Sequence, residues 1–300
     1  MDLKADIRRH VMATLPHDPS DTDATSELAS MDIGRLLVTY HNWLSRLIRP
    51  VARSVHLSKA YQANPMRAQF SAPLRDILSS LERGRDLTPR LSKDVALGYV
   101  AGSRSTSRDK DLLLNDWGVH HLHLGTGPDQ NNPNFIARTD ELLLVMLLSN
   151  TAYVIDIFAH KQWTSRAIVR AAIDSWPNVE LFPQVKGVLP SRNGYTEAEH
   201  LKLRKSGILT SVDIDGQVYI GRGFLSTAGT SSSSQRAADL LLDQVEDFED
   251  QWKQAPDSIR AMIAAKGDVC PNTPDFEFIF TETTHGVLEK VSGTLLQFAS

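Results

Sequence analysis

Three histidines fall within four consecutive positions of the chain, at His120, His121 and His123. An imidazole ring changes charge near neutral pH, so it can transfer protons, and its neutral form is a common metal ligand. We expect the stretch 116–125 to form a strand, in which alternate side chains point to opposite faces. His121 and His123 then share one face, while His120 lies on the other. The pair His121/His123 is therefore the first candidate for a chemical site.

A second group of chemically active side chains lies on either side of the apolar segment 142–148: His160, Lys161 and Trp163 follow it, and Arg108, Lys110 and Arg138 precede it. A histidine can act as general acid or base, lysine and arginine can hold a phosphate, and an indole offers a stacking surface for an unpaired base. Together these groups can cleave an RNA phosphodiester through its own 2′-hydroxyl. We expect catalytic roles for His121, His123, His160, Lys161 and Arg138, and substrate-binding roles for Arg108, Lys110, Trp163 and Asp156.

The same histidines also fit metal ligation. His121 and His123 have the H-x-H spacing of two ligands on one strand face, and Asp156 and His160 could complete a site for Zn, Mn or Fe. The sequence has no H-E-x-x-H motif to support this alternative. A cofactor is thus required only by the metal-dependent hydrolase hypothesis, and not by the ribonuclease hypothesis.

A predicted β-hairpin must position these groups. The segments 142–148 and 153–160 are apolar and lie on either side of the short turn 149–151. If the turn is centred on Asn150, Asp140 lies opposite His160 and Leu144 lies opposite Asp156. Strand alternation also places Val154, Asp156, Phe158 and His160 on one face of the second strand.

The rest of the chain predicts an α+β protein with helices packed around a central antiparallel sheet. A second hairpin crosses Asp215-Gly216, a strong turn signal, and residues 16–26 resemble a polar loop. Apolar periodicity and capping residues predict helices at about 2–15, 31–49, 72–83, 164–175, 197–205, 235–252 and 257–266, and a strand at 276–281. We expect three regions: a helical region 1–90, a β-hairpin core 91–180 with the histidine strand, and a region 181–300 with the second hairpin and the C-terminal helices, which can be continuous with the core.

One segment is basic although the chain as a whole is acidic. Its members are Arg46, Arg49, Arg53, His56, Lys59 and Arg67. The segment fits either a solvated helix face or a local phosphate-binding patch.

Composition and charge argue against a general nucleic-acid binder, a secreted protein and a membrane-spanning protein. The net charge of −4 and pI of about 6.2 give no overall attraction to nucleic acid or anionic membrane, so any RNA contact needs a local basic patch. Cys270 is the only cysteine, which fits a reducing compartment. The first residues lack the apolar run of a signal peptide, and 142–148 is too short to span a membrane. We expect a soluble cytoplasmic protein.

The order of a histidine strand, a loop, an arginine, an apolar hairpin and a terminal His-Lys pair resembles the β core of RelE/ParE-type bacterial toxins. The resemblance covers about residues 108–165, with Arg138, His160 and Lys161 matching the family's basic residues by position. It implies a bacterial endoribonuclease or growth-inhibiting toxin, with a role in antiphage defence and an antitoxin or other protein partner. This chain is longer and more acidic than those toxins, and clustered histidines are not a hallmark of the family.

Three functions follow from these observations. The leading hypothesis is a metal-independent endoribonuclease that uses the histidines, Lys161 and Arg138. The alternatives are the metal-dependent hydrolase with His121, His123, Asp156 and His160 as ligands, and a non-enzymatic interaction or accessory protein whose histidines are structural. The sequence indicates neither the substrate nor the oligomeric state.

Overall fold

The computed structural model describes residues 1–102, 110–190, 194–280 and 284–298, and it has the expected α+β fold. The chain divides into two compact units. The terminal unit joins the two ends of the chain and comprises Met1–His41, Tyr99–Gly102 and Ser234–Ser300. The central unit comprises Asn42–Gly98 and Ser103–Ser233.

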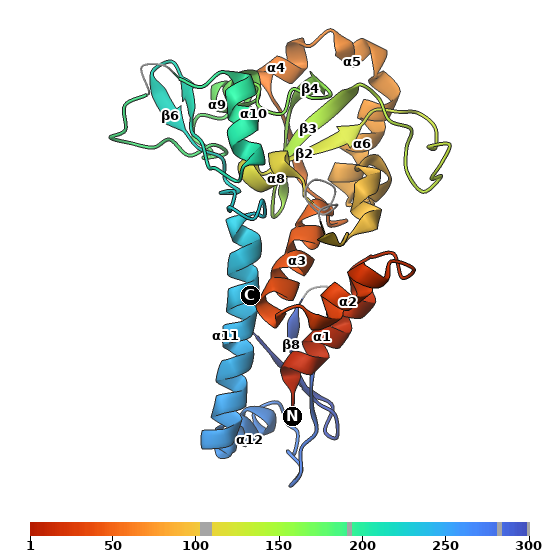
Figure 1. The fold of residues 1–300 in the computed structure, drawn as a ribbon, viewed down its shortest axis with the longest axis vertical. Coiled ribbons are helices and arrows are strands. Elements are labelled where there is room, and N and C mark those ends of the chain that lie inside the picture. The colour runs from red at the N-terminus through yellow and green to blue at the C-terminus, as the bar shows by residue number, and fades with distance from the viewer. Residues whose placement is uncertain (103–109, 191–193, 281–283, 299–300) are drawn as a thin grey trace. The chain divides into compact units, whose positions relative to one another are not determined.

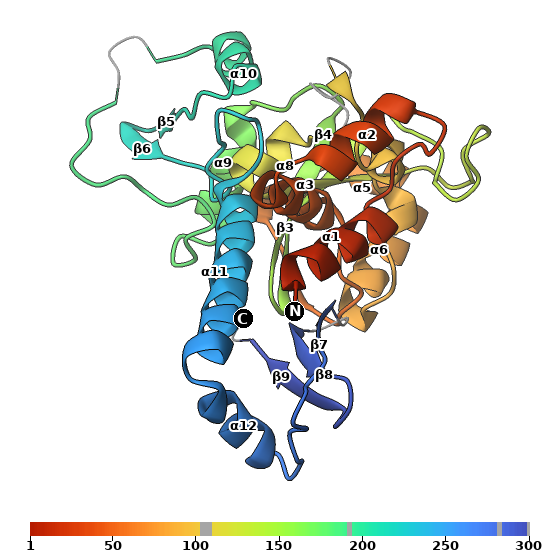
Figure 2. The same ribbon diagram turned by 60° about the horizontal axis from the view of Figure 1, so that its bottom comes forward.

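The terminal unit combines helices with a small antiparallel sheet (Figure 2). Its first two helices begin at polar caps: Asp2 accepts a hydrogen bond from the backbone N–H of Ala5, and Asp21 accepts hydrogen bonds from the backbone N–H groups of Asp23 and Ala24. Because Asp21 starts a helix, the loop predicted at 16–26 is too long. The helices are α1 (Leu3–Thr14), α2 (Thr22–Ser30), most of α3 (Ile33–Arg46), α11 (Ser232–Gln254) and α12 (Pro256–Ala264), and the strands are β7 (Phe276–Phe280), β8 (His285–Glu289) and β9 (Thr294–Gln297).

The central unit is built on a mixed sheet in the order β1-β4-β3-β2. Strands β2 (Val119–His123), β3 (Glu141–Leu148) and β4 (Thr151–Ala159) are antiparallel, and β1 (Ser54–Leu57) pairs with β4 in parallel. The predicted hairpin is β3 and β4. Strand β2, which carries the histidines, lies at an edge of the sheet in the described part of the chain.

Apolar side chains cover both faces of this sheet, with α6 (Ser71–Arg83) and α9 (Arg166–Ser175) on opposite sides (Figure 1). Ile77 of α6 packs in one cluster with Leu122 and Val145. Ile168 of α9 packs in the other with Leu144. This double cover explains why the segment 142–148 is apolar at every position. It also confirms that the two faces of β2 alternate as predicted, since Leu122 and Leu124 join the α6 cluster and Val119 joins the α9 cluster.

The hairpin register is the predicted one at its open end. Leu144 pairs with Asp156, and the backbone N–H of His160 donates to the carbonyl of Asp140. A β-bulge follows, because Val145 pairs with Val154 and leaves one extra residue in β4. The bulge turns Val154 toward the α6 cluster, so the prediction that Val154 and Asp156 share a face is wrong.

Several short elements complete the central unit: α4 (Lys59–Ala63), α5 (Met66–Gln69), α8 (Leu112–Trp117), α10 (Glu197–Lys205), β5 (Val212–Ile214), β6 (Gln217–Tyr219) and two 3₁₀ turns at Thr88–Arg90 and Lys93–Leu97. Helix α10 has the predicted bounds, and β5 and β6 form the predicted second hairpin, although its strands are shorter than expected. Asp116 and Trp117 belong to α8 rather than to the histidine strand. Among the described residues, none of the helices combines the length and the apolar character needed to cross a lipid bilayer.

Candidate functional site

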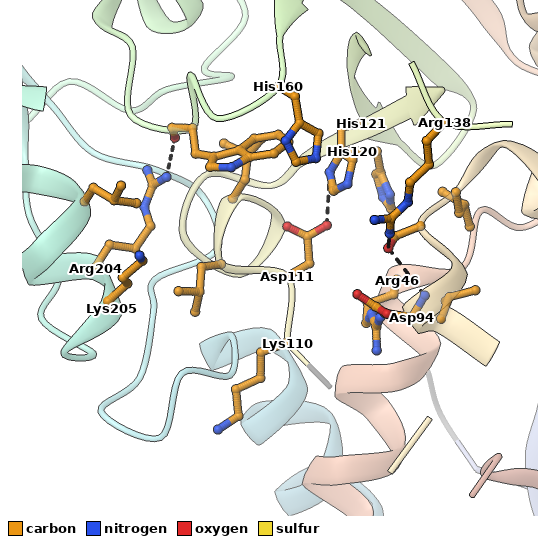
Figure 3. A pocket seen from close by; sticks show the side chains of 17 residues that line it. Arg46, Asp94, Lys110, Asp111, His120, His121, Arg138, His160, Arg204 and Lys205 are labelled. Atoms are coloured by element: carbon orange, nitrogen blue, oxygen red, sulfur yellow. Dashed lines mark hydrogen bonds and ion pairs between the residues drawn. The ribbon is translucent and has the colours of Figure 1, made fainter. Parts of the chain in front are cut away.

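A cavity of about 340 Å³ opens at the edge strand β2 of the central unit (Figure 3). Because β2 has a free edge, side chains from both of its faces, His120 and His121, reach the same space. Within the described chain, the lining holds five cationic side chains against two carboxylates, so the cavity is basic although the whole chain carries a net charge of −4. The polar lining and its one tryptophan are Arg46, Ser92, Asp94, Lys110, Asp111, His120, His121, Arg138, His160, Trp163, Arg204 and Lys205.

Asp111 lies within ion-pair distance of His121. One carboxylate oxygen of Asp111, Oδ1, accepts a hydrogen bond of 3.0 Å from the backbone N–H of Leu114 and so caps α8. The other, Oδ2, lies 3.3 Å from Nδ1 of His121 (Figure 3). The cap fixes the direction of the carboxylate, so its second oxygen faces the ring of His121. Sequence reasoning missed Asp111. Its only signal was an aspartate before a short apolar run, which is typical of a helix N-cap.

His160 and His121 contact the same indole. The ring centre of Trp163 lies 5.1 Å from that of His121 and 5.0 Å from that of His160. His160 stands in a tight turn that follows β4, where the backbone N–H of Gln162 donates to the carbonyl of Ala159 at 3.2 Å. The turn and the indole together bring the second imidazole into the cavity that contains the first.

The environment of His160 favours its neutral form. Partial burial lowers the pKa of His160 most, and His121, Arg138 and Lys161 lower it further, while Asp140 opposes them. At neutral pH this imidazole is therefore ready to accept a proton.

His120 and His123 are buried, with 8% and 2% of their surfaces exposed. Burial lowers the pKa of His120 to about 4 and that of His123 to about 3. His123, predicted to be catalytic, does not line the cavity; its ring centre lies 6.5 Å from that of His121. It is on the predicted face of β2, but it is a neutral core residue beside the site.

The cations of the lining are held in two ways. The guanidinium of Arg204 is buried inside the protein: Nε donates to Asp116 at 2.7 Å, Nη1 donates to the carbonyl of Trp163, and the group lies 4.4 Å from the ring centre of Trp117. Arg204 therefore ties α10 to α8 and to the loop that bears Trp163. Arg138, by contrast, donates to the hydroxyl of Ser92, at 3.1 Å, and forms no ion pair with the carboxylates of the described residues.

Lys110 and Lys205 also line the cavity, and neither forms an ion pair or side-chain hydrogen bond within the residues described. Of the predicted basic segment 46–67, only Arg46 belongs to the lining, because a strand and two helices interrupt the segment. Arg53 instead turns back onto the carbonyls of Arg49 and Val51.

Two further predicted site residues, Asp156 and Lys161, lie outside the cavity. Asp156 is outside the cavity, where it accepts a hydrogen bond of 2.8 Å from Asn64 and where burial raises its pKa. The side chain of Lys161 is exposed and does not line the cavity. Arg108 falls outside the described residues.

The predicted metal-ligand set is not brought together, because Asp156 is held by Asn64 and His123 is buried outside the cavity. In the part of the chain that the structure describes, no group of three or more His, Cys, Asp or Glu side chains has an arrangement that could hold a metal ion.

The residues brought together are thus His121, His160, Arg138, Lys110 and Trp163 from the prediction, with Asp111, His120, Arg204 and Lys205 added by the fold. Models of known protein families, curated proteins and solved structures were compared with the chain, and none of them matched.

Proposed function

We propose that this protein is a metal-independent endoribonuclease whose active site is the cavity at β2. The observation that carries the proposal is the pair of imidazoles, His121 and His160, in contact with one indole inside a basic cavity. Two such imidazoles can supply the base and the acid that transesterification of RNA requires. The cations around them can bind the phosphate and stabilise the charge that develops on it.

The roles of the two histidines follow from their surroundings. His160 has a lowered pKa, so its neutral ring accepts the proton of the 2′-hydroxyl as that oxygen attacks phosphorus. His121 lies 3.3 Å from the Asp111 carboxylate and acts as the general acid that donates a proton to the departing 5′-oxygen. The new bond joins the 2′-oxygen to phosphorus, and the bond from phosphorus to the 5′-oxygen breaks. The products are a 2′,3′-cyclic phosphate and a 5′-hydroxyl.

RNA is the substrate class that this chemistry selects, because DNA lacks the attacking 2′-hydroxyl. A cavity of about 340 Å³ is at the small end of ligand sites and has room for a nucleotide taken out of a stack, not for a duplex. The acidic net charge gives no general attraction to nucleic acid, so binding must come from the local cations of the cavity.

The direct experiment incubates single-stranded RNA with purified protein in excess EDTA. We expect cleavage by the wild type and a loss of at least about 100-fold in the variants His121→Ala and His160→Ala, since each removes a proton-transfer group. His56→Ala is a matched control, because His56 belongs to the same unit, stacks on Tyr153 at 5.4 Å and does not line the cavity. Equal cleavage by all four proteins would show that the activity does not belong to this site.

A further inference from the structure

The cavity carries more free positive charge than one phosphate needs. Arg138, Lys110 and Lys205 all line it, and in the described chain none of the three is paired with a carboxylate. They come from three separate segments: the residues before β3, the residue before the α8 cap, and the last turn of α10. In Figure 3, Arg138 and Lys205 lie on opposite sides of Asp111. The positive charge is therefore distributed along the cavity rather than gathered at one point.

Arg138 and Lys205 are exposed and Lys110 is half-buried, so all three can reach a bound anion and form charge-assisted hydrogen bonds with it. Arg138 appears in Figure 3 beside His120 and His121, on the side where the proposed proton transfer takes place. Lys110 and Lys205 lie away from that side, and the flexible ammonium of a lysine suits a phosphate whose position varies. Single-stranded RNA presents a second phosphate one nucleotide from the scissile one.

We propose that the cavity binds two consecutive phosphates of single-stranded RNA. Arg138 holds the scissile phosphate, and Lys110 and Lys205 hold its neighbour. This inference rests on the proposed function and adds the substrate class: the protein acts on oligoribonucleotides with at least two phosphodiester linkages. Mononucleotides and dinucleoside monophosphates, which lack the second charged linkage, are poor ligands.

Binding can test this without cleavage. The probe is a fluorescently labelled trinucleotide with two phosphodiester linkages and 2′-deoxy sugars, which cannot undergo the reaction. Two analogues each carry one neutral methylphosphonate, at either linkage in turn. Fluorescence polarisation should show that the wild type binds each analogue on the order of tenfold more weakly than the parent, the value of one charge-assisted hydrogen bond.

The variant Lys205→Ala tests which of the two phosphates this lysine binds. It should lose roughly tenfold in affinity for the parent trinucleotide, and little for the analogue whose neutral linkage replaces the neighbouring phosphate. The slope of the logarithm of the binding constant against the logarithm of the salt concentration should fall by about 0.7, because one phosphate contact is lost. Lys202→Ala is the matched control: it removes an exposed lysine from the same last turn of α10 that does not line the cavity.

Two results would overturn the inference: equal affinity of the wild type for parent and analogues, or equal losses for Lys205→Ala and Lys202→Ala. The readout is independent of the reaction, because the probe lacks the attacking hydroxyl. If charge-dependent binding is found but RNA is never cleaved, the proposed function fails and the two-phosphate site stands. If RNA is cleaved but Lys205→Ala changes the affinity for none of the three probes, the two-phosphate site fails and the proposed function stands.

Discussion

Asp111 is the residue on which the proposed chemistry depends most, because it serves the fold and the site at once. One of its oxygens caps α8, and the other lies 3.3 Å from the ring of His121. The replacement Asp111→Asn separates the two roles, since asparagine caps helices about as well as aspartate but carries no charge. We expect turnover to fall by about 10²- to 10⁴-fold, while the melting temperature changes little. Unchanged turnover in the folded variant would remove Asp111 from the mechanism.

Because His123 is buried, we expect the free energy of unfolding to depend on pH. The unfolded chain protonates this ring near pH 6.5, whereas the folded protein does so only near pH 3. Between these values the unfolded state binds more protons, so stability falls as the pH falls through this window. His123 alone should account for a loss of about 2 kcal/mol between pH 7 and pH 5.

Urea unfolding of the wild type and of His123→Gln at both pH values checks this, because the variant should show a smaller loss on acidification. The same loss in both proteins would mean that His123 does not stay neutral in the folded state.

The sequence predicted the faces of His121 and His123 correctly, because strand alternation is a local property. It could not distinguish a histidine in the cavity from one in the core, since that difference depends on what packs against the strand. For the same reason it selected Asp156, whose partner Asn64 lies 92 positions away, and missed Asp111.

At the level of elements, the turn after β4 holds a non-glycine residue in an unfavourable backbone conformation. Lys161 has a φ of 82°, the left-handed region that glycine adopts more easily. Lys161→Gly should relieve this strain and, after the greater entropy of the unfolded chain is counted, stabilise the protein by about 0.5–1 kcal/mol. RNA cleavage should be retained, because Lys161 does not line the cavity. Thermal unfolding and an RNA cleavage assay check both statements, and loss of cleavage in the folded variant would restore the catalytic role that the sequence predicted.

The backbone at Gly221 packs closely against the C-terminal end of helix α8, at Asp116. A Cβ atom at Gly221 would lie 2.1 Å from the carbonyl oxygen of Asp116, so any side chain there must displace the helix that begins at Asp111. We expect Gly221→Ala to cost about 1–3 kcal/mol in unfolding free energy and to reduce turnover, because the Asp111–His121 contact shifts. Gly127→Ala, at a position with nothing within 4 Å of the added carbon, is the control and should change stability little. If the two variants unfold alike, the close contact is not present in solution.

Periodicity and turn signals predicted most helices and both hairpins, since these patterns are local. Other features could not be predicted in this way, and three of them lie in the sheet and helix that form the site. Strand β1 pairs with β4 almost a hundred residues later, the bulge near Ile155 exists only through pairing, and α8 is too short to show a period. Because α8 supplies Asp111 and the bulge sets which side chains of β4 face each cluster, the details of the site were beyond local reasoning.

At the scale of the whole molecule, the acidic net charge does not indicate the local basic cavity. The chain carries −4, yet in the described part of its central unit the lining of one cavity holds five cationic side chains against two carboxylates. Their convergence depends on contacts between distant segments, from the end of α3 to the end of α10. Composition excluded a general nucleic-acid binder, but the local basic site became visible only in the folded chain.

The most direct test of the central claim is the chemical identity of the RNA ends produced in excess EDTA. The two-histidine mechanism predicts a 2′,3′-cyclic phosphate and a 5′-hydroxyl from the wild type. It also predicts no cleavage at a linkage that follows a single 2′-deoxynucleotide, and at least about 100-fold slower formation of these products by His160→Ala. Cleavage that EDTA abolishes, or that proceeds at the 2′-deoxy linkage, would contradict the account.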